Sequence, residues 1–436
     1  MFAALKLICQ RNLVTELSDD QKLGMGNRLT PFALTRPKFA FPACMAVRLA
    51  LEFNSTTRKS QERERLQVAK HMRLCIKVND GFDTIVSVAP SEPIMAEGAR
   101  FLMSNSKFDL PGSLLHELQT AGLDKGNRGE LICLVLLLLA CDRAAAAAQA
   151  QATAKAQAPT RAFSVHEFFK NLLNKDDYAK LSEAMPSRGA NMDPELPTFQ
   201  ETFADSKIYF NHFIKLQDHR VVNRKYLWKL IARGAAILCA NNQVGMDVLV
   251  PFSYNDTKLG RMNVSAILIQ VKNDRRFSTT PIRWLFDGMD PFFVGLFDDD
   301  PLPVIRMVFA LSSAKTGVTI MEPEGTRYRR KVKGKKAKSP PYTSFDIWCA
   351  GAFASTFAVI KKTEENTYQQ LLKVCSPFPG SYQSSLDLDE EEAQRRSMYP
   401  GSMIDADHWG AFEDAEDAGE EMEEYDYYIE SEEDGT

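Results

Sequence analysis

The sequence lacks the cysteine patterns that stabilise small secreted domains or bind structural zinc. Its eight cysteines include no pair separated by two residues, and they form no zinc-binding pattern with histidine. Most of them lie within apolar runs, which is typical of reduced thiols in a hydrophobic core. We therefore expect an intracellular protein, in the cytoplasm or the nucleus, without disulfide bonds.

The sequence also has little that predicts secretion or membrane insertion. The N-terminal segment MFAALKLICQRN is interrupted by Lys6, and no small-residue cleavage site follows it. The longest apolar run, Leu131–Cys141, is too short to cross a bilayer and is bounded by Glu130 and Asp142. We expect this run to be a buried helix and expect no transmembrane helix.

Charge is divided unevenly along the chain, which the net charge of −4 conceals. Residues 387–436 contain 20 Asp and Glu against two Arg, whereas residues 1–386 carry a net charge of +14. A basic body is typical of proteins that bind polyanions such as nucleic acids. We interpret residues 376–436 as a disordered acidic tail, which either solvates the protein or covers its basic surface.

The densest basic stretch is TRYRRKVKGKKAKSPP, at residues 326–341. Its cations are Arg327, Arg329, Arg330, Lys331, Lys333, Lys335, Lys336 and Lys338. A solvated loop, an arm that contacts nucleic-acid phosphates and a nuclear-import signal all have this composition. We take these eight cations as candidate nucleic-acid-binding residues.

The first half of the chain is mainly helical in pattern. Residues 1–110 are interpreted as a helical lead-in, with helices expected at Ser60–Val78 and Ser91–Ser104. The strongest helix is expected at Asp124–Arg143. Residues 144–200 begin with an Ala/Gln-rich tract without core-forming residues, which either extends the preceding helix for some turns or forms a linker. A short amphipathic helix is expected at Phe163–Leu173, and we interpret residues 144–200 as an insertion.

Three apolar runs in residues 234–273 predict consecutive β-strands. Their expected bounds are Ala235–Ala240, Asp247–Phe252 and Val264–Lys272. A fourth run, Val304–Leu311, follows a partly helical crossover. Its continuous hydrophobicity is typical of a buried parallel strand.

An acid, an amide and a lysine stand at one end of this otherwise apolar sheet. A two-residue period places Gln270 and Lys272 on one face of the third strand. If the second and third strands form a hairpin, Asp247 lies beside them. Glu130 begins the strongest helix, where a carboxylate serves either the helix dipole or a metal site. His212 has no acid or thiol at ligand spacing and is expected in the core or on the surface.

These elements resemble the PD-(D/E)xK nuclease superfamily, which has the restriction-endonuclease-like fold. In that pattern an acid on the second strand is followed by (Glu/Gln/Asp)-x-Lys on the third. Here Met246 precedes the acid in place of proline, and Gln270 stands where an acid is more usual. The resemblance implies a metal-dependent phosphodiesterase.

The chemistry of phosphodiester cleavage suits these residue types. A hard divalent ion, Mg²⁺ or Mn²⁺, prefers oxygen ligands and stabilises the transition state. The candidate ligands are Asp247, Gln270 and the backbone carbonyl of Val271, and Glu130 joins them or holds a metal-bound water. Lys272 would orient the attacking water and offset phosphate charge. Alternatively, Asp247 and Lys272 are simply solvated residues at strand ends.

A closer resemblance covers most of residues 65–360. It is carried by the segments KHMRLC, SEPIMAEGARFLM, GNRGELICLVLLLLACDRA, IYFNHFIK, LWKLIARGAAILCANNQVGMDVLVP, AILIQVKND, FDGMDPFFVGLFD and VIRMVFAL. They resemble large fungal proteins whose restriction-endonuclease-like module is related to the toxin domains of Crinkler-type effectors. Such proteins often have an upstream P-loop NTPase, but the GxxxxGK[ST] motif is absent from this sequence.

We therefore expect an α/β fold, with a restriction-endonuclease-like mixed sheet flanked by helices at residues 111–375. The expected activity is metal-dependent hydrolysis of nucleic acid, with DNA as the first candidate substrate. The alternative is a catalytically inactive nucleic-acid-binding or effector-like interaction protein that keeps the nuclease fold.

Overall fold

The structure is a computed structural model that describes most of residues 44–373, together with Tyr427–Tyr428. Within that range the undescribed residues are 51–63, 66–67, 70–72, 79–84, 89–90, 105–108, 119–124, 155–161, 189–196, 217, 241–242, 244, 256–259, 299, 323–328, 333–334 and 338–339. Residues 1–43 and almost all of the predicted acidic tail also lie outside the described part of the chain.

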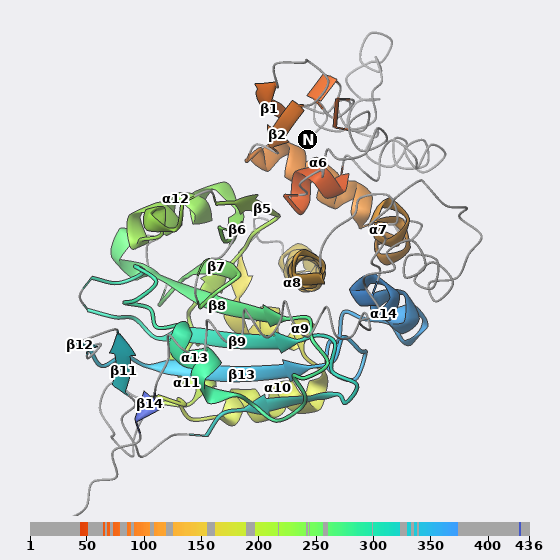
Figure 1. Ribbon diagram of the computed structural model, residues 1–436. Helices are drawn as coiled ribbons and strands as arrows, with labels where there is room; N and C mark the ends of the chain where they lie inside the picture. The colour runs from red at the N-terminus through yellow and green to blue at the C-terminus, as the bar shows by residue number, and fades with distance from the viewer. Residues whose placement is uncertain are drawn as a thin grey trace, which may run out of the picture.

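A nine-stranded mixed sheet forms the centre of the protein (Figure 1). Its strand order is β10-β13-β9-β8-β7-β4-β3, and β6 joins β7 to β5. The strands are β3 (Phe163–Ser164), β4 (Lys207–Ile208), β5 (His212–Lys215), β6 (Ala235–Leu238), β7 (Val248–Ser253), β8 (Val264–Lys272), β9 (Val304–Ala310), β10 (Gly317–Ile320) and β13 (Ser344–Ala350).

The sheet confirms the strand order that the apolar runs predict. β8 has the predicted bounds, and β7 begins one residue after Asp247. β7 and β8 form the expected antiparallel hairpin, with Val248 opposite Ile269. β9 then returns parallel to β8, with Ile267 beside Ile305. A mixed α/β fold is therefore established.

The two faces of the sheet pack against different helices, because successive side chains of a strand point to opposite faces. On β8, Ile267 and Ile269 belong to the core that includes α8, whereas Ala266 and Leu268 face α12 and α13. The helices are α6 (Pro93–Met103), α7 (Leu110–Leu118), α8 (Lys125–Ala154), α9 (Val165–Leu172), α10 (Lys175–Glu183), α11 (Phe199–Thr202), α12 (Arg224–Arg233), α13 (Arg283–Gly288) and α14 (Glu365–Lys373).

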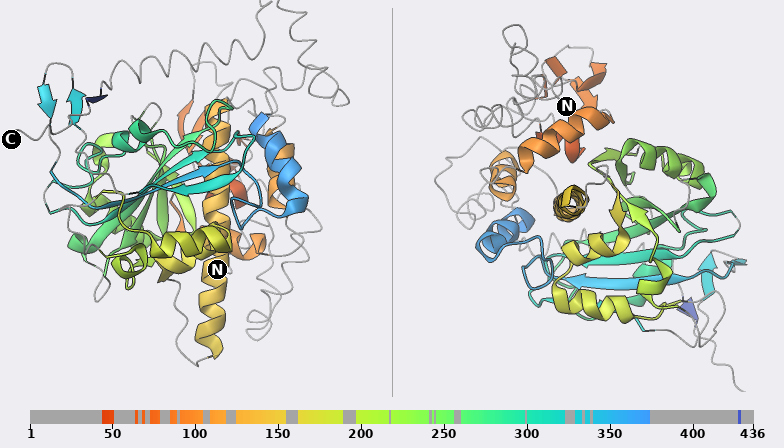
Figure 2. Two further views of the ribbon diagram at one scale, coloured as in Figure 1. Left: turned by 90° about the horizontal axis from the view of Figure 1, so that it is seen from below. Right: turned by 180° about the vertical axis from the view of Figure 1, so that it is seen from behind.

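Figure 1 shows the long helix α8 end-on, and Figure 2 (left) shows it from the side. It continues past Arg143 through the Ala/Gln tract to Ala154, the first of the two predicted alternatives, because alanine is the strongest helix former. The expectation that this tract contributes nothing to the core is wrong, since Ala144 and Ala145 are buried. One candidate membrane span, Arg128–Gln151, meets the length and hydropathy criteria, but 67% of its most apolar window is buried inside the protein.

The amphipathic helix expected in the segment interpreted as an insertion is confirmed as α9, whose Phe168 and Phe169 are fully buried. One region differs from its predicted secondary structure. The expected helix Ser60–Val78 is wrong over Leu74–Val78, which forms strand β1 and pairs with β2 (Ile85–Val88). Leu74, Ile76 and Val78 recur at every second position, which is the period of a strand and was the signal that the helix prediction overlooked.

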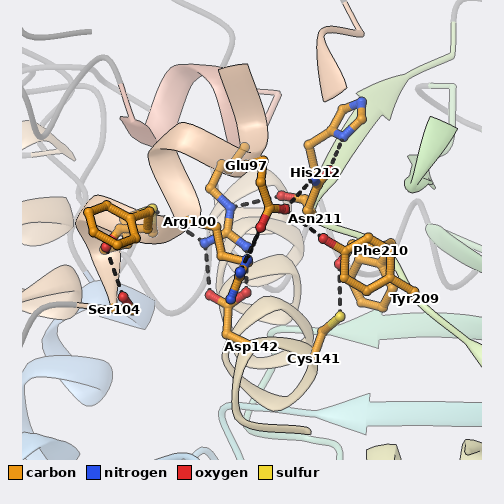
Figure 3. Close-up of polar contacts among 12 residues, drawn as sticks. Glu97, Arg100, Ser104, Cys141, Asp142, Tyr209, Phe210, Asn211 and His212 are labelled. Atoms are coloured by element: carbon orange, nitrogen blue, oxygen red, sulfur yellow. Dashed lines mark hydrogen bonds and ion pairs between the residues drawn. The ribbon is translucent and has the colours of Figure 1, made fainter. Parts of the chain in front are cut away.

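A buried polar network joins the N-terminal region to α8 and to the start of β5 (Figure 3). Arg48 is fully buried and donates to both carboxylate oxygens of Asp142 at 2.8 Å. Its Nε donates to the Asn211 carbonyl at 2.8 Å. Glu97 of α6 accepts from the Tyr209 hydroxyl at 2.7 Å and from the Asn211 amide at 3.1 Å. These contacts fix α6 against the core.

His212 is buried within the same network. Its Nδ1 lies 2.7 Å from the amide oxygen of Asn211, which can only accept, so Nδ1 carries the proton. Nε2 therefore accepts from the Ser91 hydroxyl at 2.9 Å. Burial, with Arg48 and Arg233 close by, lowers the pKa of His212 to about 4. The same two guanidinium groups oppose the imidazolium that a general base must form, so we assign this Ser–His–Asn chain a structural role.

Removing the charge of Asp142 is expected to destabilise the protein strongly. Asp142→Asn leaves the buried Arg48 cation without its counter-charge, which lowers the free energy of unfolding by about 3–5 kcal/mol. Urea titration followed by circular dichroism measures the change. The control is Asp218→Asn, which breaks an exposed pair with Arg220 and should change unfolding little. Equal effects of the two substitutions would contradict the role of the buried pair.

Acidification is expected to weaken the network through His212. The unfolded chain protonates near pH 6.5 but the folded one only near pH 4, so stability is lost as pH falls through this interval. The full shift corresponds to about 3 kcal/mol. Burial raises the pKa of Asp287 to about 6. Protonation of this carboxyl therefore adds stability as the pH falls through part of the same interval and opposes the effect of His212.

The measurement is therefore a comparison of His212→Leu with the wild type. Urea titrations of both proteins at pH 7 and pH 4.5 give the loss of stability on acidification, and the contribution of Asp287 cancels in the difference. The variant should lose less stability than the wild type. An equal loss in both proteins would show that protonation of His212 does not cause the loss of stability on acidification.

Candidate active site

Asp247 is fixed against the carboxyl end of β8. Its backbone amide donates to the Ile269 carbonyl at 2.9 Å, and its carboxylate accepts from the Val271 amide at 2.5 Å. Its own carbonyl accepts from the Cys239 amide at 2.8 Å, just after β6. The carboxylate is therefore held where β6, β7 and β8 meet.

Gln270 and Lys272 lie beside this carboxylate, on one face of β8. Asp247 precedes the paired register of β7, and it bonds to the two residues on either side of Gln270, namely the Ile269 carbonyl and the Val271 amide. Gln270 is 5% exposed, and its amide oxygen is buried with no hydrogen-bond partner among the described residues. Lys272 is half-buried, and its Nζ lies 5.7 Å from the centre of the Phe277 ring.

The Val271 carbonyl also points towards Asp247. The next carbonyl, that of Lys272, accepts from the Leu311 amide at 3.0 Å on the β9 side of the strand. Successive carbonyls of an extended strand point to opposite edges, so the Val271 carbonyl points to the β7 side. The predicted backbone ligand thus lies on the same side of β8 as the carboxylate.

Helix α8 brings Glu130 to the same end of the sheet. The preceding residue, Gly129, is in such close contact with β8 that an added Cβ would lie 2.7 Å from the Cβ of Asn273 and 3.2 Å from Cγ1 of Val271. Glycine is required here because any side chain would push the helix away from the strand. Glu130 itself is half-buried.

The electrostatic surroundings of two thiols place Glu130 and Asp247 in one neighbourhood. Cys133 lies on α8 and Cys239 follows β6, and both are free and buried. Burial raises the pKa of each thiol well above its ordinary value, and the charges of Asp247 and Glu130 raise both further. The Cys133 and Cys239 thiols, on different elements, are thus both within range of the charges of Asp247 and Glu130.

Lys215 is a further cation at this site that the sequence analysis missed. It ends β5 beside Leu238, and the next residue of that neighbouring strand is Cys239. Its positive charge acts on the Cys239 thiol in opposition to burial and to Asp247. The only sequence signal was its place at the end of a short apolar run.

The donors of this site suit a hard cation. They are two carboxylates, an amide oxygen and a backbone carbonyl, and oxygen ligands of this kind are those that Mg²⁺ and Mn²⁺ accept. Across the part of the chain that the structure describes, no group of three or more His, Cys, Asp or Glu side chains could hold a metal ion. Any ion here would therefore depend on the amide and the carbonyl.

The basic stretch lies at the opposite end of the sheet (Figure 1). Within it, β11 (Arg329–Val332) and β12 (Lys335–Ala337) form a hairpin that leads into the first residue of β13, beside Val304. Lys272 pairs instead with Ala310, at the other end of β9. The seven residues of β9 span about 23 Å. Arg327, Lys333 and Lys338 lie outside the described residues.

The described part of the acidic tail pairs with this basic hairpin. Tyr427–Tyr428 forms strand β14, antiparallel to β11, with Tyr427 opposite Arg330 and Tyr428 opposite Arg329. The rest of the predicted tail lies outside the described residues, so its disorder stays a prediction.

Comparison with known proteins gives a family match over residues 54–283, to a domain of unknown function, DUF8736. No curated protein and no solved structure matches the chain. The matched segment includes Glu130, Asp247, Gln270 and Lys272 and ends before β9. Because the match covers more than half of the sequence, this chain belongs to the DUF8736 family.

Proposed function

We propose that this protein is a metal-dependent phosphodiesterase of the PD-(D/E)xK type that hydrolyses nucleic acid, with DNA as the first candidate. The observation that carries the proposal is the buried amide oxygen of Gln270, which has no partner among the described residues and lies next to Asp247. A buried polar atom left unpaired costs about 1–3 kcal/mol. A cation bound at this position would remove that cost.

The arrangement of elements also supports a restriction-endonuclease-like core. The chain order is α8, β6, β7, β8, α13 and β9, with an antiparallel hairpin followed by a parallel return. This order is that of the fold which the sequence resembles. The match to a family of unknown function neither adds to nor detracts from this proposal.

Asp247, Gln270 and the Val271 carbonyl are the groups that would hold Mg²⁺ or Mn²⁺. Glu130 would contribute from the end of the sheet, because α8 packs on the face of β8 opposite to Gln270. When bound, the ion offsets the negative charge that develops on the phosphate in the transition state. With only two carboxylates nearby, we expect its affinity to be modest and to depend on Glu130.

Lys272 acts on the substrate itself. Its ammonium group can donate three hydrogen bonds, which suffices to hold a phosphate oxygen and to orient the attacking water. The Phe277 ring limits its motion, and that ring in turn contacts Trp348 at a centroid distance of 6.5 Å. The Trp348 indole donates to the Ser278 carbonyl at 2.7 Å, so the loop after β8 is tied to β13.

The alternative is a nucleic-acid-binding or effector-like interaction protein that keeps the fold without cleaving. Only two carboxylates lie at the candidate site, and no group of three or more His, Cys, Asp or Glu among the described residues could hold a metal ion, which favours this alternative. The two proposals differ in whether divalent ions and Asp247 are needed for strand cleavage.

Substitution of the candidate catalytic residues is expected to abolish cleavage but not binding. Asp247→Asn and Lys272→Met should each reduce Mg²⁺-dependent cleavage of a labelled DNA duplex by about 100-fold or more. Denaturing gels measure cleavage, and fluorescence anisotropy in EDTA measures binding. The controls are Asp298→Asn and Lys229→Met, which remove exposed charges elsewhere. Full activity in both candidate variants would exclude this site.

Substitution of Gln270 tests the metal site without any activity assay. Gln270→Leu removes the unpaired oxygen, so the metal-free protein should be as stable as the wild type or more stable. The same variant should lose the rise in melting temperature that Mn²⁺ causes in the wild type. Gln270→Glu adds a ligand charge and should tighten Mn²⁺ binding about tenfold.

The control for this experiment is Gln200→Leu, on the exposed surface of α11. It should leave both the melting temperature and the Mn²⁺ effect unchanged. A Mn²⁺ effect that persists in Gln270→Leu would place the ion elsewhere and remove the observation on which the proposed function depends.

A further inference from the structure

The basic hairpin has an edge to which a further strand can be added. β11 and β12 lie in the connection between β10 and β13, and β12 pairs with one edge of β11. On the other edge of β11, backbone N–H and C=O groups point away from β12. An edge of this kind is a template for another extended segment.

Strand β14 occupies this edge. Arg329 is opposite Tyr428 and Arg330 is opposite Tyr427, so the three strands form a small sheet in the order β12-β11-β14 (Figure 1). β14 belongs to the C-terminal end of the sequence, far from the hairpin along the chain. Closing so long a loop costs conformational entropy, so an attraction between the two segments has to offset that cost.

Opposite charge supplies such an attraction. Residues 327–338 carry eight Lys and Arg and no acid, whereas residues 420–434 carry nine Asp and Glu and no Lys or Arg. Charged residues on a strand edge ordinarily keep other strands away. A strand from an acidic sequence is the exception, because opposite charges on neighbouring strands stabilise their pairing. The edge of β11 therefore selects one class of partner.

The pairing is weak enough to be reversible. Only two residues of β14 are paired, and attraction between exposed charges is screened by salt. The two segments belong to one chain, however, so the local concentration of the acidic segment is high and a modest affinity is sufficient. A competitor with a higher density of negative charge could therefore displace it.

Nucleic acid is such a competitor, because its phosphates bind Lys and Arg through the same attraction. The hairpin lies about 23 Å from Lys272 along β9, which about seven base pairs span at about 3.4 Å each. A duplex at the candidate site is thus long enough to reach the hairpin. β14 lies at the hairpin and leaves the candidate site uncovered.

We propose that the outer edge of β11 is a docking surface for one acidic strand, the segment of this chain that contains Tyr427 and Tyr428, and that nucleic acid and this segment exclude each other from the hairpin. The docking depends on the pairing of β11 with β14. The competition rests on the proposed function for the identity of the partner.

The test is a reversible disulfide between the two strands of the full-length protein. Arg329→Cys with Tyr428→Cys places thiols at opposed positions of an antiparallel pair, where Cα atoms about 4.5–5.5 Å apart allow a disulfide. The matched control is Arg329→Cys with Met403→Cys, which keeps the second thiol in the same tail but outside residues 420–434. Single-cysteine variants control for bonds to native cysteines. Under mild oxidation, mass spectrometry of digests should find the new bond mainly in the opposed pair.

The disulfide should weaken DNA binding, because it keeps the acidic segment on the hairpin. Oxidised protein should bind a labelled duplex of about 20 base pairs about tenfold more weakly than the same protein after reduction by dithiothreitol. The slope of log affinity against log salt should also be shallower when oxidised, since fewer phosphates contact cations. Fluorescence anisotropy in EDTA measures both effects, so cleavage plays no part.

The converse variant releases the segment without changing its charge. Tyr427→Pro with Tyr428→Pro removes the backbone donors of β14 and should bind DNA about threefold or more tightly than the wild type. Ala415→Pro with Ala418→Pro, elsewhere in the tail, should leave the affinity unchanged. Because β14 does not cover the candidate site, the maximal cleavage rate at saturating DNA should be the same in all three proteins.

The remaining outcomes separate this inference from the proposed function. Equal crosslinking in the opposed and control pairs would exclude the docking surface. A disulfide that forms without changing DNA affinity would contradict the competition, even if the protein cleaves DNA. Absence of DNA binding by the reduced protein would likewise contradict it. Disulfide-dependent binding without cleavage at any Mg²⁺ or Mn²⁺ concentration would sustain this inference while contradicting the proposed activity.

Discussion

The burial of helix α8 is the constraint on which the rest of the structure depends. Its residues from Leu131 to Leu138 are at most 5% exposed, so the helix is stable only when the sheet and the surrounding helices cover it. Its middle is held by the buried ion pair of Arg48 with Asp142. Its N-terminal end is pressed against β8 at Gly129. Hydrophobic burial thus sets the position of Glu130, a residue that has no hydrophobic reason of its own to be there.

The sequence was most informative where a single period fits the pattern. β8 could be predicted to the residue, because its apolar run is too short for a helix and ends at a charged residue. The two-residue period of a strand also predicted that Gln270 and Lys272 lie on one face of β8. β1 was missed although its apolar residues alternate with the period of a strand, because the helical pattern expected from Ser60 onward was continued through these five residues. Lys215 was missed because its proximity to Asp247 arises only when β5 pairs with β6, a contact between distant segments.

Charge density along the chain was a poor guide to charge in space. The basic stretch has the most cations in the sequence, yet the connection from β10 to β13 places it at the end of the sheet away from Lys272. Lys215 and Lys272 each end a strand at the other end of the sheet, and neither belongs to a basic sequence motif. Topology determines this difference, because parallel strands bring their carboxyl ends together regardless of separation in the chain.

In the metal-free protein, an amide at position 270 is more stable than a carboxylate would be. The side chain is 5% exposed and lies beside Asp247, with Glu130 in the same neighbourhood. A carboxylate there would place a further negative charge in a poorly solvated position, so its pKa would rise and the protein would be destabilised near neutral pH. An amide keeps an oxygen ligand at the cost of a single unpaired acceptor. In the proposed metal site, Gln270 would bind an ion less tightly than a carboxylate would but would leave the metal-free state more stable, so occupancy would depend on the metal concentration.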